Sequence, residues 1–311
     1  MLKHPSLIGR VWLRLAEGVW ISGEALSKEL RVSKVAIWKA VKKLNSLGYV
    51  IESERGKGYR LLSEPNVPHP WRVARNLKTK VIGSFIIFID EVPSTQDLIK
   101  NVKGEGSVLF ANRQRKGRGR LGRSWFSTEK DLKLSILLKP SKVPPSNMGF
   151  ISLIAGLAVC RAIGGRLKWP NDVLLDGKKV AGVLVEGEAQ QDRLEKVYVG
   201  IGINVNSTRG LERFEATSLK LHTSKETDLA ELAANVLNHF EPLYFRLLEG
   251  KTPLDEVKEV MDTIGRKVRV VSFGEAFGGV AKDVDESGSL LVELNGSLKR
   301  VSVGDVVHLR G

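Results

Sequence analysis

The chain has 311 residues, 42% of them hydrophobic and 27% charged, which is enough apolar material for two or three globular domains and excludes a disordered or collagen-like chain. Its single cysteine, Cys160, excludes an intramolecular disulfide and a cysteine-cluster zinc site. The longest apolar stretch, residues 150–160, is shorter than the ~18 residues that a bilayer span needs, and residues 1–14 lack the pattern of a signal peptide, so we expect a soluble cytoplasmic protein.

The net charge of +14 is concentrated in two short segments. Residues 1–65 hold 12 Lys and Arg against 6 Asp and Glu, and residues 112–123 hold six cations and no acid. A generally basic surface would spread the charge more evenly. Two concentrated basic segments therefore predict two polyanionic partners.

Residues 1–63 carry the pattern of a DNA-binding domain. Apolar residues recur at helical spacing in residues 7–15, and Ser22 and Ser33 are expected N-caps of two further helices. Gly48 ends the third helix, whose other face is basic, and residues 49–52 and 59–62 are expected to form a hairpin around a cationic turn. This order predicts a winged helix-turn-helix; the alternative is a plain three-helix cap whose lysines are solvated. The expected DNA contacts are Ser33, Lys34, Lys39, Lys42, Lys43, Arg55 and Lys57, and the proline-rich residues 63–70 are an expected linker.

The second basic segment predicts a phosphate-binding loop. Gly117, Gly119 and Gly122 spell the G-x-G-x-x-G of a dinucleotide fold, but no helical pattern and no acidic residue follow at the required distance, which disfavours NAD. Glycines let the backbone approach a ligand, arginines neutralise phosphate, and Trp125 offers a face on which a base can stack. Such a loop suits adenylation of a carboxylate by ATP. A short RNA-binding tract is the alternative.

Five motifs, taken in their order along the chain, indicate a resemblance to one protein family. The segment GRGRLGRSW at residues 117–125 resembles the adenylate-binding loop of biotin–protein ligases. The pair Ser94-Thr95, KWPND at residues 168–172, KKVAG at residues 178–182 and GIGINVN at residues 200–206 match further motifs of that family. With the predicted DNA-binding domain, the resemblance covers essentially the whole chain and extends to the bifunctional members, the biotin operon repressors.

The resemblance implies roles for the matching residues. Biotin contacts are implied for Ser94, Thr95, Gln96, Gln114, Arg118, Gly119, Arg120, Lys179 and Gly182, with Gln96 in the place of the family's usual asparagine. Nucleotide contacts are implied for Gly117, Arg118, Arg120, Arg123, Trp125, Asn171 and Asn204, with Trp125 stacking on adenine. Leu121 and Ser124 replace basic residues that some repressors carry.

Three of these positions are the expected catalytic residues: Lys179, Arg118 and Asp172. Lys179 matches the lysine that contacts the biotin carboxylate and the phosphoryl group, where a fixed cation stabilises developing negative charge. Without the resemblance, the local sequence would place Lys179 in a solvated turn. Asp172 either orients or deprotonates the incoming lysine amine, or helps to hold magnesium. Metal ligands stay unassigned, because the five histidines lack metal-ligand spacing.

The rest of the chain predicts an α+β fold. Strands are expected at residues 81–89, 107–111, 132–138, 166–169, 180–188 and 195–205, and helices near residues 95–101, 146–163 and 227–248. After residue 264 short alternating runs predict a small β-barrel. We therefore expect a winged helix-turn-helix domain at residues 1–63, a mixed-sheet catalytic domain for biotin and ATP at residues 66–263, and a β-barrel domain at residues 264–311.

The resemblance implies a biotin–[acetyl-CoA-carboxylase] ligase that is also a biotin-responsive transcriptional repressor. With ATP and Mg²⁺ such an enzyme converts biotin into biotinyl-5′-AMP and transfers biotin to a lysine of a biotin carboxyl carrier protein. Operator DNA and a second copy of the chain, as a homodimer, are further expected partners, and a membrane is not. Two alternatives stay open: a ligand-sensing transcription factor without catalysis, and a relative that ligates lipoate or octanoate.

Overall fold

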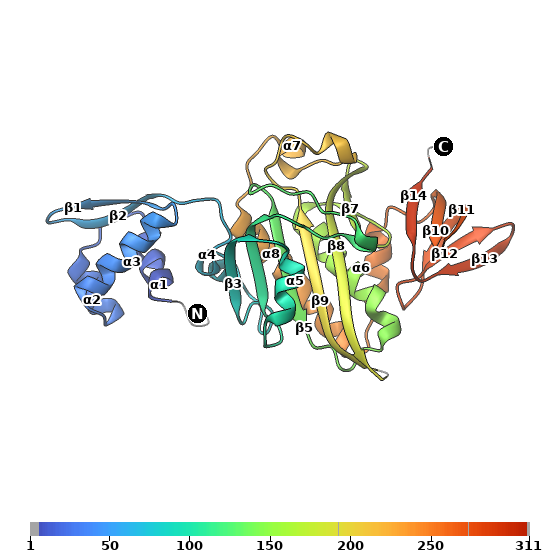
Figure 1. Cartoon of the computed structure of the whole chain (residues 1–311), viewed down its shortest axis with the longest axis horizontal. Helices are drawn as coiled ribbons and strands as arrows, with labels where there is room; N and C mark the ends of the chain where they lie inside the picture. Colours follow the sequence, from blue (N-terminus) through green and yellow to red (C-terminus); the bar gives the residue numbers. More distant parts are fainter. Residues whose placement is uncertain (1–5, 192, 273, 310–311) are drawn as a thin grey trace. The chain divides into compact units, whose positions relative to one another are not determined.

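The chain divides into two compact units, Met1–Asn76 and Leu77–Gly311 (Figure 1). The computed structural model describes residues 6–191, 193–272 and 274–309. Each unit has its own core, and each is described by itself.

The N-terminal unit contains three helices, a hairpin and a fourth helix: α1 (Leu7–Leu15), α2 (Gly23–Leu30), α3 (Lys34–Ser46), β1 (Val50–Glu54), β2 (Gly58–Ser63) and α4 (Pro70–Asn76). Ser22 and Ser33 cap α2 and α3, since each side-chain oxygen accepts a hydrogen bond from the N–H three residues on. Trp12, Leu26, Ile37 and Leu44 are fully buried between the helices. The caps and the basic face of α3 therefore lie where the sequence places them.

Helix α4 was not predicted, because its residues continue the proline-rich stretch that reads as a linker. Arg72, which is 6% exposed, donates through Nη1 to the carbonyl oxygens of Pro65 (2.6 Å) and Val67 (3.1 Å). One buried guanidinium thus holds the stretch before α4 in a fixed shape.

The C-terminal unit is built on a seven-stranded mixed sheet with the order β3-β4-β5-β9-β8-β7-β6. Only β3 and β4 pair in parallel. The strands are β3 (Ile86–Val92), β4 (Val108–Gln114), β5 (Leu132–Leu138), β6 (Arg166–Lys168), β7 (Asp172–Leu175), β8 (Lys178–Gln190) and β9 (Arg193–Ile203). The mixed α+β fold is confirmed, and β7 is the one strand of this sheet that the sequence did not predict.

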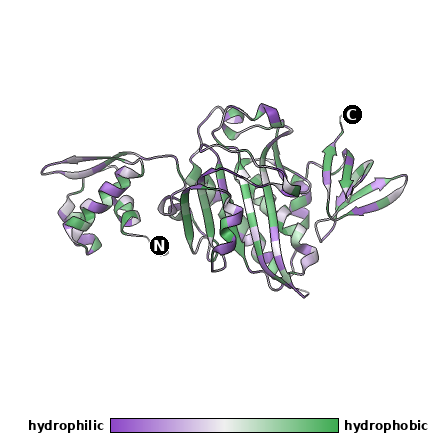
Figure 2. Cartoon of the chain, in the orientation of Figure 1, coloured by the Kyte–Doolittle hydropathy of each residue, from purple (hydrophilic) through white to green (hydrophobic). Residues whose placement is uncertain are grey.

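Helices complete the core of this unit: α5 (Thr95–Leu98), α6 (Met148–Ile163), α7 (Leu219–Thr223), α8 (Leu229–Leu248) and α9 (Leu254–Val260). Hydrophobic residues gather on the strands of the central sheet, while the connecting loops are hydrophilic (Figure 2). Residues 145–163 are long and apolar enough to cross a membrane by length and composition, but residues 150–160 are all buried, against α8 and β8 among others. The apolar character of α6 is therefore that of a core helix.

The chain ends in a five-stranded antiparallel sheet with the order β13-β12-β11-β10-β14. Its strands are β10 (Lys267–Ser272), β11 (Glu275–Val284), β12 (Leu290–Leu294), β13 (Ser297–Val301) and β14 (Asp305–His308). The indole N–H of Trp169, at the end of β6, donates to the carbonyl oxygen of Gly288 in this sheet at 2.9 Å. This buried contact joins the sheet to the KWPND segment.

The strand expected at residues 81–89 begins later, at Ile86, because a buried carboxylate binds the preceding backbone. Glu241 of α8, which is 5% exposed, accepts the N–H groups of Lys80, Val81 and Ile82 at 2.5 to 2.8 Å. These donors are therefore used by a helix side chain rather than by a neighbouring strand.

Replacing Glu241 by alanine should lower the free energy of unfolding by about 3 kcal/mol, because it leaves buried N–H groups without an acceptor. Urea denaturation measures the loss. Glu231→Ala, at an exposed position on the same helix, should change it by less than about 0.5 kcal/mol. Equal effects of the two variants would show that the contact is not stabilising.

Candidate active site

A cavity of about 300 Å³ opens over the central sheet. Its lining comes from α5, the ends of β4 and β6, the strands β8 and β9, the segment between β4 and β5, and β14. Every residue with an implied biotin contact lines it: Ser94, Thr95, Gln96, Gln114, Arg118, Gly119, Arg120, Lys179 and Gly182. Arg123, Trp125, Asn171 and Asp172 line it too, whereas Gly117 and Asn204 lie outside the lining. The fold thus gathers residues that are spread over 89 positions between Ser94 and Gly182.

Three glycines form a strip on β8 and β9, the glycine strip: Gly182, Gly200 and Gly202. A Cβ at Gly202 would lie 2.4 Å from Cε2 of Trp125, and one at Gly182 would lie 3.0 Å from its Cζ3. The absence of side chains therefore lets the indole ring of Trp125 lie directly on the sheet. Its Nε1 is buried, and among the described residues it has no hydrogen-bond partner.

Residues 115–127, the arginine loop, turn back on themselves above the glycine strip. The N–H of Gly119 donates to the carbonyl oxygen of Arg123 (2.7 Å), and that of Trp125 donates to Gly117 (2.9 Å). At the tip Leu121 has a φ of +54°, and its side chain is 68% exposed. These backbone hydrogen bonds therefore order the base of the loop, while its tip exposes an apolar side chain to solvent.

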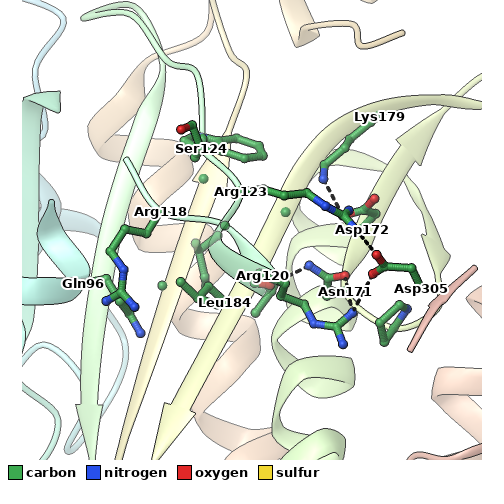
Figure 3. Close-up of a pocket in the computed structure, with 18 of the residues that line it drawn as sticks. Gln96, Arg118, Arg120, Arg123, Ser124, Asn171, Asp172, Lys179, Leu184 and Asp305 are labelled. Atoms are coloured by element: carbon green, nitrogen blue, oxygen red, sulfur yellow. Dashed lines mark hydrogen bonds and ion pairs between the residues drawn. The ribbon is translucent and has the colours of Figure 1, made fainter. Parts of the chain in front are cut away.

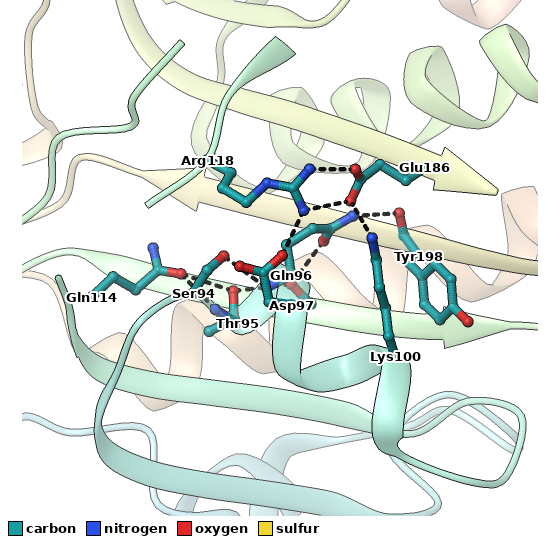
Figure 4. A network of polar contacts seen from close by, with 10 residues as sticks. Ser94, Thr95, Gln96, Asp97, Lys100, Gln114, Arg118, Glu186 and Tyr198 are labelled. Atoms are coloured by element: carbon teal, nitrogen blue, oxygen red, sulfur yellow. Dashed lines mark hydrogen bonds and ion pairs between the residues drawn. The ribbon is translucent and has the colours of Figure 1, made fainter. Parts of the chain in front are cut away.

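Arg118 is held by two carboxylates that the sequence did not point to (Figure 4). Its guanidinium donates to Asp97 of α5 at 2.7 Å and to Glu186 of β8 at 2.6 Å. The hydrogen bond that Arg118 donates to Glu186 raises the pKa of Arg118. Burial alone would raise the pKa of Glu186, but the hydrogen bond from Arg118 turns the shift downward. Both groups are therefore charged at neutral pH.

Arg120 and Arg123 both approach Asp305 at the start of β14 (Figure 3). Arg120 also donates to the carbonyl oxygen of Gly304 at 3.2 Å and to Oδ1 of Asn171 at 3.4 Å. Burial lowers the pKa of Arg120 from its usual value. No motif marks Asp305, because a lone aspartate in an alternating strand reads as a solvent-facing residue. The terminal sheet thus contributes a carboxylate to the site.

Lys179 and Asp172 face each other across the hairpin of β7 and β8. The Nζ of Lys179 lies 2.6 Å from Oδ1 of Asp172 and 5.4 Å from the ring centroid of Trp125. Two of the expected catalytic residues therefore form an ion pair beside the indole ring. A cation held in this place can stabilise negative charge that develops in the cavity.

Uncharged polar groups line the other end of the cavity. Oε1 of Gln114 accepts hydrogen bonds from the N–H of Thr95 (2.8 Å) and from its hydroxyl (3.1 Å). Gln96 accepts from Ser135 at 3.0 Å and donates to the carbonyl oxygen of Tyr198 at 3.0 Å, so its amide already has protein partners at both atoms. This network fixes the side chains that the family resemblance assigns to biotin (Figure 4).

The two asparagines with implied nucleotide roles are both anchored. Asn171 donates to the carbonyl oxygen of Val183 (2.8 Å), and Asn204 donates to that of Thr217 (3.0 Å). Oδ1 of Asn204 is buried and finds no hydrogen-bond partner in the part of the chain that the structure describes. Within residues 6–191, 193–272 and 274–309, no group of three or more His, Cys, Asp or Glu side chains is placed to hold a metal ion.

The expected DNA contacts lie in the N-terminal unit and are all exposed. Ser33 caps α3 through its hydroxyl. Lys39, Lys42 and Lys43 project from the face of α3 opposite its buried residues. Lys34 and Lys57 have acidic partners, Glu24 and Glu54, at 3.1 and 2.9 Å. The basic surface of this unit is therefore centred on α3.

Comparisons with known proteins agree over most of the chain. Residues 88–204 match the model of the biotin/lipoate A/B protein ligase family, residues 11–60 that of an HTH domain, and residues 263–309 that of the biotin protein ligase C terminal domain. The "Bifunctional ligase/repressor BirA" of Bacillus subtilis is 34% identical over 304 residues, which cover 92% of this chain and 93% of that protein. The Escherichia coli protein of the same name is 30% identical over 315 aligned positions, which cover 94% of each.

A solved structure is similar to the C-terminal part of the chain. The biotin protein ligase from Aquifex aeolicus, in complex with biotin and ATP, has a TM-score of 0.65 and 33% sequence identity. The match covers 73% of this chain and 99% of that chain.

Gly202→Ala should push the ring of Trp125 off the sheet, because the new Cβ would stand 2.4 to 2.7 Å from three ring atoms. We expect faster amide hydrogen exchange in residues 115–127, by roughly tenfold, measured by mass spectrometry. Gly278→Ala is the matched control, since its Cβ would meet only a carbonyl oxygen at 3.7 Å. Unchanged exchange in Gly202→Ala would mean that the ring does not rest on the glycine strip.

Proposed function

This chain belongs to the biotin–protein ligase family, and from that premise we propose that its cavity makes biotinyl-5′-AMP from biotin and ATP. The single observation that carries the proposal is the convergence of Arg118, Arg120, Arg123 and Lys179 on one cavity beside a strip of glycines. Cations that surround a narrow apolar floor suit a reaction in which negative charge develops on phosphoryl oxygens.

In this proposal biotin lies beside the ring of Trp125, at the Gly200 end of the glycine strip. Its bicyclic ring sits where Ser94, Thr95 and Gln114 offer hydrogen-bonding atoms, and its carboxylate points toward Lys179. A cavity of about 300 Å³ is at the lower end of ligand-sized sites. Loop movement enlarges it when the nucleotide enters.

ATP binds beside the arginines of the arginine loop, and its base stacks on the indole ring of Trp125. Trp125 lines the cavity beside Arg123 and Lys179, which supports a nucleotide whose base meets the ring and whose phosphates meet the cations. Mg²⁺ bound to the phosphates would offset part of their charge. A carboxylate oxygen of biotin bonds to the α-phosphorus, the bond to the β-phosphate oxygen breaks, and pyrophosphate leaves.

Lys179 stabilises the phosphoryl oxygens in this step, and Arg118 and Arg120 close over the adenylate. In the second step the amine of an acceptor lysine attacks the acyl carbon, AMP leaves, and an amide forms. Asp172 stands beside Lys179, where it orients that amine or accepts its proton. The acceptor is a biotin carboxyl carrier protein of acetyl-CoA carboxylase.

The remaining parts of the proposal concern organisation. Residues 1–63 form a winged helix-turn-helix that binds operator DNA in a biotin-dependent way, residues 66–263 form the catalytic domain, and the terminal strands close into a small β-barrel at residues 264–311. The protein acts in the cytoplasm and dimerises as a repressor. The exposed lysines of α3 support the DNA-binding assignment, and the terminal antiparallel sheet supports a C-terminal domain built of strands.

The test of the ligase proposal is a burst of pyrophosphate with MgATP and biotin, and none with lipoate or octanoate. The adenylate is identified by mass spectrometry. Lys179→Ala should slow the burst by about a hundredfold, because it removes a charge that is fixed beside the reacting phosphate. Lys178→Ala, at the exposed neighbouring position, is the matched control and should keep the rate.

Other outcomes would select another reading. A burst with lipoate or octanoate would make the chain a ligase for that acid. No burst with any acid would favour a ligand sensor without catalysis, and a full-rate burst in Lys179→Ala would remove Lys179 from the mechanism.

Lys42→Ala should weaken binding to duplex DNA selected from a random pool with the wild-type protein. One phosphate contact fewer should lower the slope of log affinity against log salt by about one. Fluorescence anisotropy between 50 and 200 mM salt measures both quantities. Lys251→Ala, an exposed lysine of the other unit, should change neither. An unchanged slope in Lys42→Ala would place the DNA contact elsewhere.

A further inference from the structure

Lys133 is a lysine in the middle of the core. It lies on β5, where all seven residues are buried, and it is 1% exposed. A buried ammonium group is costly unless hydrogen bonds satisfy it. Nothing in the proposed reaction uses this lysine, and no sequence motif marks it.

The ammonium group of Lys133 connects the two ends of the arginine loop. Its Nζ donates to the carbonyl oxygen of Asn112 at 2.6 Å and to that of Thr128 at 2.5 Å. Asn112 is near the end of β4, just before the loop, and Thr128 directly follows the loop. One side chain therefore satisfies a backbone acceptor on each side of the loop.

The strand pairing explains why a cation is needed here. β4 and β5 are paired from Val108 opposite Ile136 as far as Phe110 opposite Leu134, and the pairing then stops. The strands separate at this point to let the loop leave the sheet, so the ladder ends before Asn112. Lys133 gives the carbonyl oxygen of Asn112 a charge-assisted hydrogen bond in place of a ladder bond, and a second one to Thr128 in the turn before β5.

Lys133 also lies on the face of the sheet that carries the site. In the pairing of β5 with β9, Lys133 is directly opposite Gly202, and Ser135 is directly opposite Gly200. Residues opposite each other on paired strands share a face, and Gly202 is the residue on which Trp125 rests. The loop's anchor and its contact with the sheet are thus cross-strand neighbours.

A buried carboxylate extends the anchor to β9. Asp131, which is 2% exposed, accepts from the N–H of Thr128 (2.8 Å) with Oδ2 and from the N–H of Val205 (2.9 Å) with Oδ1. Val205 directly follows Asn204. The loop's C-terminal end is therefore tied to the segment that carries the unpartnered Asn204 oxygen.

We propose that Lys133 is a positioning residue for the adenylation proposed above: it holds both ends of the arginine loop, so that Trp125 and the arginines stay over the glycine strip. The proposal rests on the proposed function for its catalytic consequence, but the state of the loop can be measured without any ligand. Burial lowers the pKa of Lys133 to about 8, while Asp131 and Glu129 nearby raise it.

The test uses the full-length protein and the variant Lys133→Met, which keeps the length of the side chain and removes its charge and donors. We expect tryptic cleavage after the loop arginines to become about tenfold faster in the ligand-free protein, and release of biotinyl-5′-AMP to accelerate about as much. Lys130→Met, at an exposed position three residues away, should match wild type. Wild-type cleavage and release in a folded Lys133→Met protein would overturn the proposal.

A pH series on the wild-type protein tests the same idea if Lys133→Met does not fold. Between pH 7 and pH 9 the ammonium loses its proton, the bonds to both carbonyls weaken, and release of the adenylate should accelerate. The free energy of unfolding should instead rise with pH. Above pH 8 the folded chain has lost the proton of Lys133, whereas the unfolded chain, with a lysine pKa of 10.5, still binds it. A purely structural lysine would show only that rise in stability.

A release rate that does not increase over this range would overturn the proposal. If the wild-type protein forms no adenylate at all, the proposed function fails, whereas tryptic cleavage of Lys133→Met still decides whether Lys133 holds the loop.

Discussion

The pairing of each site cation with a carboxylate from another element is the interaction on which this site depends. Arg118 is paired with Asp97 and Glu186, Arg120 and Arg123 approach Asp305, and Lys179 is paired with Asp172. These acids come from α5, β8, β14 and β7, so the central sheet and the terminal sheet must both be in place before the cations are positioned. The order of the loop is therefore a consequence of the tertiary fold.

The glycine strip lets the loop that carries these arginines pack close to the sheet. Because no side chains stand on β8 and β9 at Gly182 and Gly202, Trp125 packs flat on the sheet and draws the loop down with it. The Nζ of Lys179 lies over the same ring at 5.4 Å, which is within the range of a cation–π contact. The close approach of the Trp125 ring to the backbone of the glycine strip thus also places the cations beside the cavity.

The sequence predicted what short-range patterns encode. The caps of α2 and α3, the buried strand β5 and the motif residues around the cavity were found because spacing and turn chemistry depend on neighbours in the chain. Strand β7 was missed because its four residues directly follow Pro170 and Asn171 and give little periodicity. Asp97, Glu186, Asp305 and Lys133 were missed because their roles depend on partners between 5 and 185 positions away. Sequence motifs identify the cations of the site, whereas the carboxylates that pair with them are identified only in the folded structure.

The charge of the arginine segment has a different meaning in the folded chain. In residues 112–123 the sequence shows six cations and no acid, which predicts attraction of polyanions in general. In the structure five of these cations lie within 4 Å of carboxylates supplied by other parts of the chain: Asp90, Glu91, Asp97, Glu186 and Asp305. Such partly exposed pairs contribute at most about 1 kcal/mol each, so a phosphate group that enters the cavity can replace them at little cost. The carboxylates therefore offset most of the charge that the sequence concentrates in this segment, and Arg118, Arg120 and Arg123 are the members of the set that line the cavity.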